Sequence, residues 1–436
     1  MTPQELTDRL RQNLSRLPGS AAVQAAREAA MNAFSGAGFP SRKLEDWRYT
    51  DLRALSEASF DLLPTRPDDA SPDAYARLIA TAGLKTGSLW LLFVDGHLIV
   101  DRASGGLPRG ATLSNLGESW DDLDPAALQM RGDSPPLAAL NMAFASQGAW
   151  LRLGEGTIVE QPIHLLLIDS DRPSQAPQPR LQIDIGRDAR ATLVQHYLGT
   201  GASSGWTNAL TRISMQAGAG LTLTRLQDHG PEHLHTELLE ADLAAGAQLD
   251  ITYIDLGGKL VRNDVQIKLR EPEAGCDLAG LFVATGGQHV DNHLRVDHCA
   301  SSTRSREVFR SIIGEHGRGV FNGKVIVHKQ TRGIDARQTS DNLLLSDRGE
   351  IDTKPELEIY ADDVKCAHGA TVGELDEEQL FYLKSRGIAD PAARGLLTLA
   401  FANEILSRAS ITGLQRRLTD KLDLELPEDL QWNPAP

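Results

Sequence analysis

Cys366 and His368 are the residues of this sequence whose types and spacing best suit metal chemistry. They stand two positions apart in Cys366-Ala367-His368, at the end of a long β-rich stretch. Residues i and i+2 of a β-strand face the same side, and thiolate and imidazole are both metal ligands. Two ligands are too few to close a site, so a metal bound here needs further ligands from elsewhere. A buried thiol beside a packed histidine at a strand end explains the pair equally well.

Two histidine-rich stretches are further candidates for metal binding. Clusters of imidazole groups can hold metal, but neither stretch has the spacing of a recognisable site. We therefore expect these histidines to be solvated residues of loops and turns. The residues concerned are His229, His233 and His235 in "DHGPEHLH", and His289, His293, His298 and Cys299 in "HVDNHLRVDHC".

The sequence contains no motif of a known catalytic or nucleotide-binding site. The loop G-x-x-x-x-G-K-[ST] is absent, as are a dinucleotide-type glycine turn, G-x-S-x-G, H-E-x-x-H and any C-x-x-C pair. Asp347, Glu350 and Asp352 come closest to the clustered carboxylates of enzymes that cleave polysaccharides. Charged turn residues would look the same, and we favour that interpretation. We expect no catalytic residue and no nucleotide bound by this chain itself.

Composition argues against several classes of partner. The 436 residues carry a formal net charge of −15, which is unusual for a nucleic-acid-binding protein or for one that docks on anionic membranes. The N-terminus lacks the apolar segment of a signal peptide, and the longest apolar runs, such as "LWLLFV" (89–94), are too short to span a bilayer. Three scattered cysteines do not suggest a disulfide framework. A cytoplasmic protein is expected.

The sequence divides into regions with different predicted secondary structure, and these regions must position the candidate residues. Helical spacing of leucines and an alanine-rich run predict an N-terminal helical domain over residues 1–60. A polar, proline-containing linker follows over 61–87. Short runs of alternating apolar and polar residues predict a β core over 88–370, and helical periodicity returns in a C-terminal domain over 371–436.

A repeat runs through the β core. Four similar segments place Leu193, Leu221, Leu249 and Leu278 at corresponding positions, with offsets of 28, 28 and 29 residues. Repeated strand–turn–strand units of near-constant length are typical of a solenoid. We therefore expect stacked coils, with these leucines pointing inward and lying roughly in a line. A β-sandwich of sequential hairpins is the alternative.

Three segments carry a resemblance to a known family. "KPELEIYADDVKCAHGATVGELDEEQLFYLKSRGI" (354–388) resembles the C-terminal signature of the SufB/SufD scaffold subunits of the Suf iron–sulfur cluster assembly machinery. "SRKLEDWRYTDL" (41–52) resembles an N-terminal motif of the SufD branch, and "RGIDARQTSDNLLLSDRGEIDTKPELEI" (332–359) is also similar to the family. The chain length and the small number of cysteines favour the SufD branch over the SufB branch.

The resemblance implies a fold and a set of partners. It implies a right-handed parallel β-helix, a solenoid core flanked by N- and C-terminal α-helical domains, in agreement with the repeat. It also implies a non-catalytic scaffold that pairs with a SufB-type subunit through the β-helix ends. A SufC-type ABC ATPase would dock on the C-terminal helical domain, to which the apolar stripe of Leu397, Phe401 and Ile405 belongs, either as partner contact or as the domain's own core. A homodimer is a further option for the isolated chain.

The resemblance also assigns roles to the opening pair. A transient iron–sulfur cluster would form at the subunit interface, with His368 as a metal ligand from this side and a cysteine of the SufB-type partner as another. Cys366 would be a cofactor-binding residue with a less defined role. Two other functions stay open, a carbohydrate-active β-solenoid and a stand-alone metal-binding protein. The first lacks an extended aromatic row for stacking on sugars, and the second lacks a complete ligand set.

Overall fold

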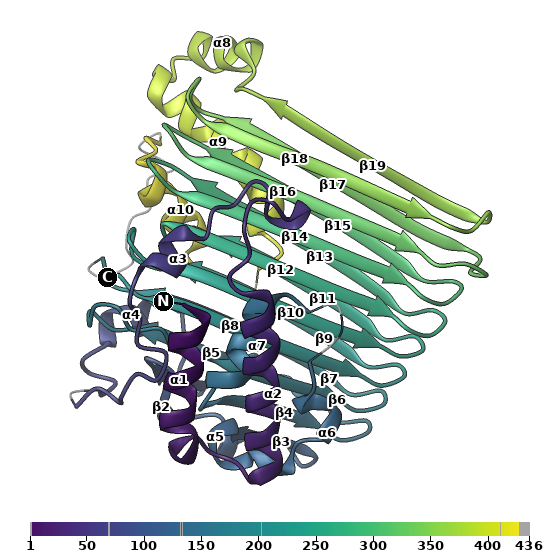
Figure 1. Ribbon diagram of the computed structural model, residues 1–436. Helices are drawn as coiled ribbons and strands as arrows, with labels where there is room; N and C mark the ends of the chain where they lie inside the picture. The colour runs from purple at the N-terminus through teal and green to yellow at the C-terminus, as the bar shows by residue number, and fades with distance from the viewer. Residues whose placement is uncertain are drawn as a thin grey trace.

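The centre of the molecule is a parallel β-solenoid of about 8 turns, built from two facing sheets (Figure 1). The computed structural model describes residues 2–68, 70–130, 132, 134–201, 203–409 and 411–426. Along the coils, successive strands alternate between the sheets, and each pairs in parallel with the strand two places away in sequence. The predicted fold class is therefore confirmed. The alternative of sequential hairpins is wrong, because hairpins pair consecutive strands antiparallel.

Each sheet consists mainly of strands about ten residues long. The ten-stranded sheet contains β1 (Leu89–Val94), β2 (His97–Asp101), β5 (Ile163–Asp169), β7 (Arg190–Gly199), β9 (Gly220–Asp228), β11 (Gln248–Asp255), β13 (Gly275–Ala284), β15 (Arg304–Ile313), β17 (Ile334–Leu344) and β19 (Val364–Gly373). The nine-stranded sheet contains β3 (Ala111–Asn115), β4 (Gly148–Leu153), β6 (Arg180–Ile185), β8 (Trp206–Met215), β10 (Leu234–Leu243), β12 (Leu260–Leu269), β14 (His289–His298), β16 (Arg318–Val327) and β18 (Glu350–Ile359). The pairs β1–β2 and β3–β4 are antiparallel and lie at the N-terminal end of the stack.

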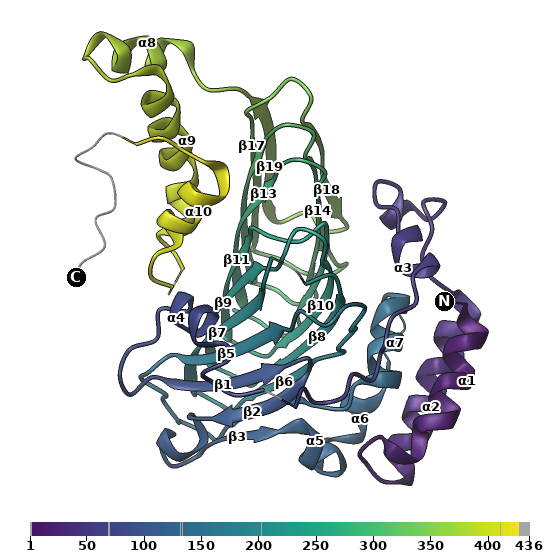
Figure 2. The same ribbon diagram turned by 90° about the vertical axis from the view of Figure 1, so that its left-hand side faces the viewer.

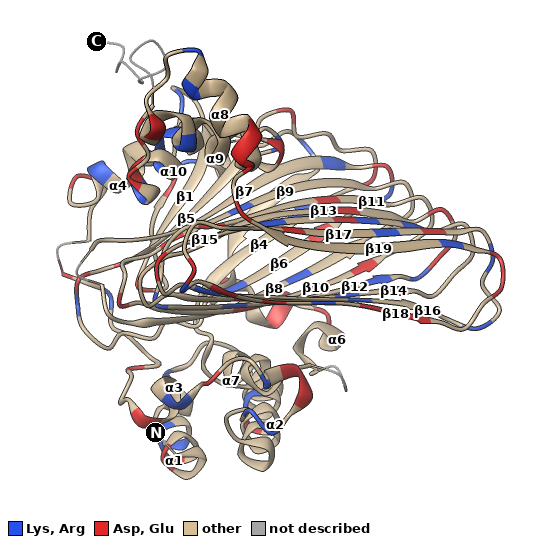
Figure 3. Cartoon of the chain, turned by 90° about the horizontal axis from the view of Figure 1, so that it is seen from above, with Lys and Arg blue, Asp and Glu red and all other residues tan. Residues whose placement is uncertain are grey.

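Helices stand on the outer faces of both sheets (Figures 2 and 3). Those before and within the first coils are α1 (Pro3–Asn13), α2 (Ala21–Ala37), α3 (Arg53–Glu57), α4 (Ala76–Thr81), α5 (Leu116–Ser119), α6 (Pro125–Leu128) and α7 (Pro136–Phe144), with short 3-10 turns at Leu14–Arg16, Glu45–Trp47, Ser104–Gly106 and Trp120–Asp122. Those after the last coil are α8 (Glu377–Ser385), α9 (Asp390–Leu406) and α10 (Leu414–Leu422). No helix in the described ranges is long and apolar enough to cross a membrane.

Three of these helices lie within residues 88–370, where short alternating runs predict strands. α5, α6 and α7 interrupt the strand order between β3 and β4. Every residue of α7 after Pro136 is buried, so its sequence has no polar face and shows no helical periodicity. Burial on all sides removes the amphipathic signal from which a helix is usually recognised.

The four repeat leucines all point into the solenoid and are buried. They do not lie in a single line, because the coils differ in length. One interior row contains Leu193, Leu223, Ile251 and Leu278, and the neighbouring row contains Leu221, Leu249 and Cys276. The rows are two residues apart on each strand. A shift by two residues keeps side chains on the same face of a strand. The inward orientation of the four leucines was therefore predicted correctly, and their alignment in one line was not.

The flanking helices bury the outer sheet faces. Helices α1, α2 and α7 pack with the outward residues Trp206, Leu234 and Leu260 of the nine-stranded sheet. Helices α9 and α10 pack with outward residues of the ten-stranded sheet, such as Leu226 and Ile312. The solenoid interior thus forms one apolar core, and each helical layer forms another around it.

The segment 41–52 fastens the N-terminal region to the nine-stranded sheet. Trp47 is buried, and the guanidinium of Arg262 lies 4.2 Å from the centre of its ring. Thr50 is hydrogen-bonded to Nε2 of His289 at 2.7 Å and donates to the carboxylate of Asp291. A cation over an aromatic face and buried polar contacts hold this segment, in which the 3-10 turn Glu45–Trp47 is the regular element.

Candidate metal-ligand site at the end of the solenoid

Cys366 and His368 lie on β19, the terminal strand of the ten-stranded sheet. β19 pairs with β17 on one side, and its other edge meets no further strand in the described chain. β18 is the corresponding terminal strand of the nine-stranded sheet. The solenoid therefore ends in two strand edges, and the two sequence-predicted ligands belong to one of them.

Strand register places the pair in the inward-facing rows of the solenoid. Cys366 stands opposite Ala336, and His368 stands opposite Gln338. Gln338 in turn stands opposite the buried Glu307. The sequence correctly predicted that Cys366 and His368 share a face. It did not indicate that this face is the inner one, continuous with the core rows of the preceding coils.

The two candidate ligands differ in exposure. His368 is exposed at the open end of the solenoid. An open groove of about 820 Å³, lined by the outward-facing Asp277, Arg306 and Arg337, reaches β19 at the position of His368. Cys366 is half-buried and packs beside Val325, Ile334 and other apolar residues of the last coils. An imidazole reachable from solvent can bind a ligand without any movement of the fold.

The thiol of Cys366 is poorly ionised in the isolated chain. Burial raises its pKa, and the neighbouring Asp335 raises it further. A thiolate is the form that binds metal. Cys366 would therefore need a metal ion or a positively charged partner nearby before it could act as a ligand, whereas a neutral imidazole already has a free lone pair.

Behind His368 the interior is polar. Nε2 of Gln338 donates a hydrogen bond to Oε2 of Glu307, and both side chains are buried. Burial raises the pKa of Glu307 to about 7, although the hydrogen bond from Gln338 opposes this. This polar row was not predicted from the sequence. The available signal was a polar residue at an inward position of each of β15, β17 and β19, where earlier coils carry leucine or isoleucine.

The expectation that the histidine-rich stretches are solvated is wrong for most of their members. His229, His233, His235 and His298 are all buried. Polar side chains near the turns at both ends of the strands contact one another instead of water. His298, for example, is hydrogen-bonded to Thr303 and Ser305 at 2.8 and 3.0 Å.

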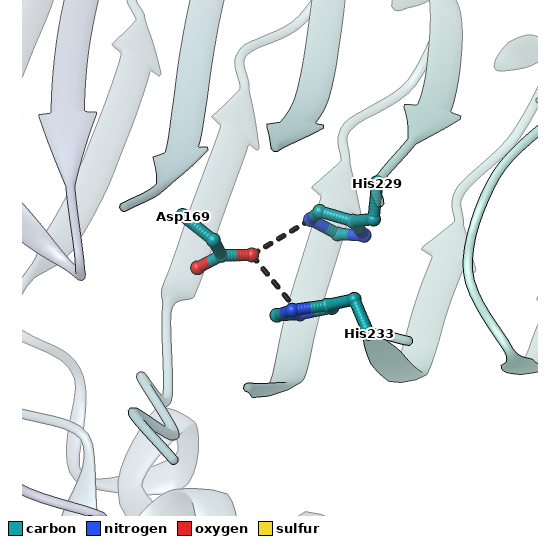
Figure 4. A group of neighbouring side chains, drawn as sticks. All are labelled: Asp169, His229 and His233. Atoms are coloured by element: carbon teal, nitrogen blue, oxygen red, sulfur yellow. Dashed lines mark ion pairs between the residues drawn. The ribbon is translucent and has the colours of Figure 1, made fainter. Parts of the chain in front are cut away.

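His229 and His233 meet a residue that the sequence analysis did not select, Asp169 at the end of β5. Oδ2 of Asp169 lies 2.7 Å from Nε2 of His229 and 3.1 Å from Nε2 of His233 (Figure 4). Burial lowers the pKa of His229 to about 3, with a further contribution from His233. No local pattern joins Asp169 to these histidines, because the stacking of separate coils brings them together.

Asp347, Glu350 and Asp352 behave as charged residues of a turn and a strand start. Asp347 and Glu350 are exposed, and Asp352 accepts a hydrogen bond from Nη2 of Arg318 at 3.0 Å. The three cysteines are unpaired. The apolar stripe on α9 packs on the sheet: Ile405 is buried, and the guanidinium of Arg310 covers the half-buried ring of Phe401.

Comparison with known proteins shows what the chain is similar to. Residues 167–401 match the model of the SUF system FeS cluster assembly SufBD core domain, and residues 5–122 match the SufBD protein N-terminal region. The iron–sulfur cluster assembly protein SufD of Escherichia coli is 29% identical, over 89% of this chain and 90% of the relative. SufBD family proteins of Synechocystis and Mycobacterium leprae are 29% and 28% identical, over 90% and 89% of this chain and 88% and 90% of their own lengths.

Proposed function

This chain belongs to the SufBD family of iron–sulfur cluster assembly proteins, and from that premise we propose that it is a non-catalytic scaffold subunit of a cluster assembly complex. The observation that carries the proposal is the open solenoid end, where Cys366 and His368 stand on a terminal strand. Two ligands on a strand edge make half of a site. A subunit that docks on that edge supplies the other half, and the cluster is the cargo of the complex.

A SufB-type subunit is the proposed partner at this end. The free edges of β18 and β19 carry backbone donors and acceptors that another chain can extend. Large apolar side chains are also exposed beside these edges, at Ile359, Tyr360 and Val372. Such an edge can pair with a strand of another chain. When the SufB-type subunit is missing, a second copy of this chain could pair there instead.

His368 is the proposed ligand from this side of the interface. Imidazole in place of thiolate reduces the negative charge on a cluster and weakens its hold. A scaffold must retain a cluster during assembly and then release it to a client. A mixed site shared between two subunits suits both demands, because relative movement of the subunits can open it.

A SufC-type ABC ATPase is the proposed partner of the C-terminal helices. α8 stands away from the sheets beside the solenoid end (Figure 2), and it exposes Phe381 at 71% and Tyr382 at 57%. Aromatic residues so exposed on a helix are typical anchors of a protein interface. Phe401 and Ile405 of the stripe on α9 pack against the ten-stranded sheet, so α8 is the better candidate for the contact.

Anaerobic co-purification tests this function. The chain would be co-expressed with SufB-type and SufC-type subunits of the same organism, and iron and acid-labile sulfide would be measured per assembled complex. We expect a complex that contains all subunits and forms a cluster, while the chain alone hydrolyses ATP only at background rate and is recovered in the cytoplasmic fraction. Equal cluster yield in a complex lacking this chain would contradict the scaffold role.

A further inference from the structure

Asp169, His229 and His233 form a buried group inside the solenoid, far in the stack from β19. Asp169 ends β5, while His229 and His233 flank the turn between β9 and β10. All three side chains are buried. Figure 4 shows the carboxylate of Asp169 directed at both rings, which approach it from the same side. Two imidazoles and one carboxylate are the ligand set that non-haem iron and zinc sites use.

The distances within the group match those between ligands of one metal ion. Ligands at about 2.1 Å from a metal and at right angles to each other are separated by about 3 Å. The two distances from Oδ2 of Asp169 are 2.7 Å to His229 and 3.1 Å to His233, and all three ligand atoms lie within 4.8 Å of one another. An ion could therefore bind with only small adjustments of the side chains.

The hydrogen bonding of the group is incomplete in a way that points to a bound ion. Nε2 of His229 is buried and has no aligned hydrogen-bond partner in the described chain, although Oδ2 of Asp169 is only 2.7 Å away. Its lone pair or proton is directed beside the carboxylate oxygen. An ion lying between the three ligand atoms would meet that lone pair, and a buried nitrogen without a partner would no longer be left unsatisfied.

The other nitrogens of both rings are held from outside. Oγ of Ser203 lies 3.0 Å from Nδ1 of His233, and the amide nitrogen of Gln227, a donor, lies 3.1 Å from Nδ1 of His229. An ion bound at Nε2 of His229 requires the proton on Nδ1, so the amide of Gln227 would turn its oxygen to this ring. Thr207 also contacts the group, with its hydroxyl 2.7 Å from Oδ2 of Asp169 and 3.0 Å from Nε2 of His233. Contacts of this kind orient the ligands of metal sites.

A glycine lies between the coils that carry Asp169 and His229. Gly199 stands opposite Asp169 in the sheet register, and a Cβ at this position would lie 3.5 Å from Cδ2 of His229. Because residue 199 has no side chain, Asp169 can reach past this strand to His229. Gly199 also lines a cavity of about 860 Å³ together with Arg172 and Thr200.

The charge of the surroundings favours a cation. The buried Arg225 is already paired with Glu237 and Asp255, so it does not compensate the carboxylate of Asp169. A buried carboxylate without a counter-charge is costly. A bound cation would balance the charge of Asp169 and use both rings as ligands.

We propose that Asp169, His229 and His233 bind one divalent transition-metal ion of the zinc or ferrous iron class within the solenoid. This site is separate from His368 and does not depend on the proposed scaffold function. His235 completes the polar surroundings, with its ring centre 5.3 Å from that of His229 and neither ring nitrogen hydrogen-bonded within the described residues.

Cobalt binding to the full-length chain tests the proposal. The chain would carry His368→Ala to remove the exposed ligand, would be treated with a chelator, and would then be titrated with Co²⁺. We expect one Co²⁺ per chain, visible absorption bands typical of nitrogen and oxygen ligands without a thiolate charge-transfer band, and a higher Tm. Asp169→Asn and His229→Gln should each weaken binding by more than about 100-fold.

Matched controls distinguish the site from adventitious binding. His298→Gln changes a buried histidine outside the group, and His316→Gln changes an exposed one; both should leave Co²⁺ affinity unchanged. Absence of stoichiometric Co²⁺ binding to the parent chain would overturn the proposal whether or not the variants fold, and would assign the balance of charge to a proton. Unchanged affinity in folded Asp169→Asn would overturn it as well.

Discussion

At the residue scale, the important feature of His368 is its position at the end of the inward-facing row that contains Glu307 and Gln338. This position suits a ligand better than a packed side chain. In every earlier coil, the next coil covers the corresponding side chain, and His368 has no such cover within the described chain. Its exposed imidazole makes little contribution to the core. A change at this position should therefore act on chemistry rather than on folding.

His368→Ala should leave stability and subunit association nearly unchanged while sharply lowering cluster yield. Replacing an exposed side chain usually changes the free energy of unfolding by less than about 0.5 kcal/mol. The measurements are thermal unfolding and iron and sulfide per assembled complex. His316→Ala, at an exposed turn histidine, is the matched control and should keep full yield. Cys366→Ala should reduce yield less than His368→Ala. A normal yield per complex in His368→Ala would remove the ligand role.

Glu307→Gln should change how stability depends on pH. The folded-state pKa of Glu307 is raised from 4.5 to about 7 by burial, so between these values the folded state binds more protons than the unfolded state. Its contribution to stability is present below pH 4.5 and lost as pH rises through 7. The variant should therefore gain stability relative to wild type over this range, by roughly 2–3 kcal/mol at pH 8.

Urea unfolding of both proteins between pH 4.5 and pH 8 measures this difference. Glu155→Gln, at an exposed position of a turn, is the control and should show no such trend. A constant difference between Glu307→Gln and wild type across the range would mean that Glu307 is ionised in the folded protein, with water or a cation reaching it.

At the element scale, terminal elements differ from internal ones in what covers them. α9 lies on the ten-stranded sheet, with Ile405 buried and Phe401 under Arg310. α8 follows directly on the last strand and buries only Leu380. A short helix with two exposed aromatic side chains gains little from the chain's own core, so a partner is the natural source of its stabilisation.

Combined replacement Phe381→Ala and Tyr382→Ala should weaken binding of the ATPase subunit by about tenfold or more. The Tm of the chain alone should stay the same, because both rings are largely exposed. Calorimetric titration or surface plasmon resonance measures the affinity. Ile158→Ala, which removes a half-exposed side chain from a turn of the first coils, should have no effect. Unaltered ATPase binding in the double variant would place the contact elsewhere on the C-terminal domain.

At the scale of the whole molecule, the solenoid interior changes character along one edge. Leucine and isoleucine rows fill most of it, while the edge near the turns contains buried histidines and paired charges such as Arg225 with Glu237. Burial also lowers the pKa of histidines elsewhere in the molecule, such as His164 and His298. A buried histidine that stays neutral in the folded state lowers the free energy of unfolding once the solution is acidic enough to protonate it in the unfolded chain.

The protein should therefore lose stability as pH falls below about 6.5. Burial lowers the folded-state pKa of His164 and of His298 from 6.5 to about 4, so the unfolded state binds more protons between these values. Each histidine's contribution is fully present above pH 6.5 and disappears as pH falls through 4, by roughly 2–3 kcal/mol. His298→Gln should flatten this dependence in urea unfolding between pH 7.5 and pH 5. An equal acid dependence in wild type and variant would show that His298 titrates normally.

The sequence by itself determined what depends on neighbours along the chain. Alternation of apolar residues indicated strands, near-constant spacing indicated coils, and the pair Cys366–His368 was placed on one face because side-chain direction in a strand is a local property. The motifs in 41–52, 332–359 and 354–388 indicated the iron–sulfur assembly machinery from the sequence alone. The helix α7 was missed because complete burial removes the periodicity that marks a helix.

Only the tertiary structure decided which residues of one coil lie opposite which residues of the next. The repeat leucines fall into two rows because turn lengths differ between coils, and the same register places Glu307 and Gln338 behind His368. Asp169 meets His229 and His233 because separate coils stack with a glycine between them. Direction within a strand is set by a few backbone dihedrals, whereas register between coils depends on every intervening turn. Contacts between coils, and whether a histidine is buried, are therefore settled only when the whole stack has formed.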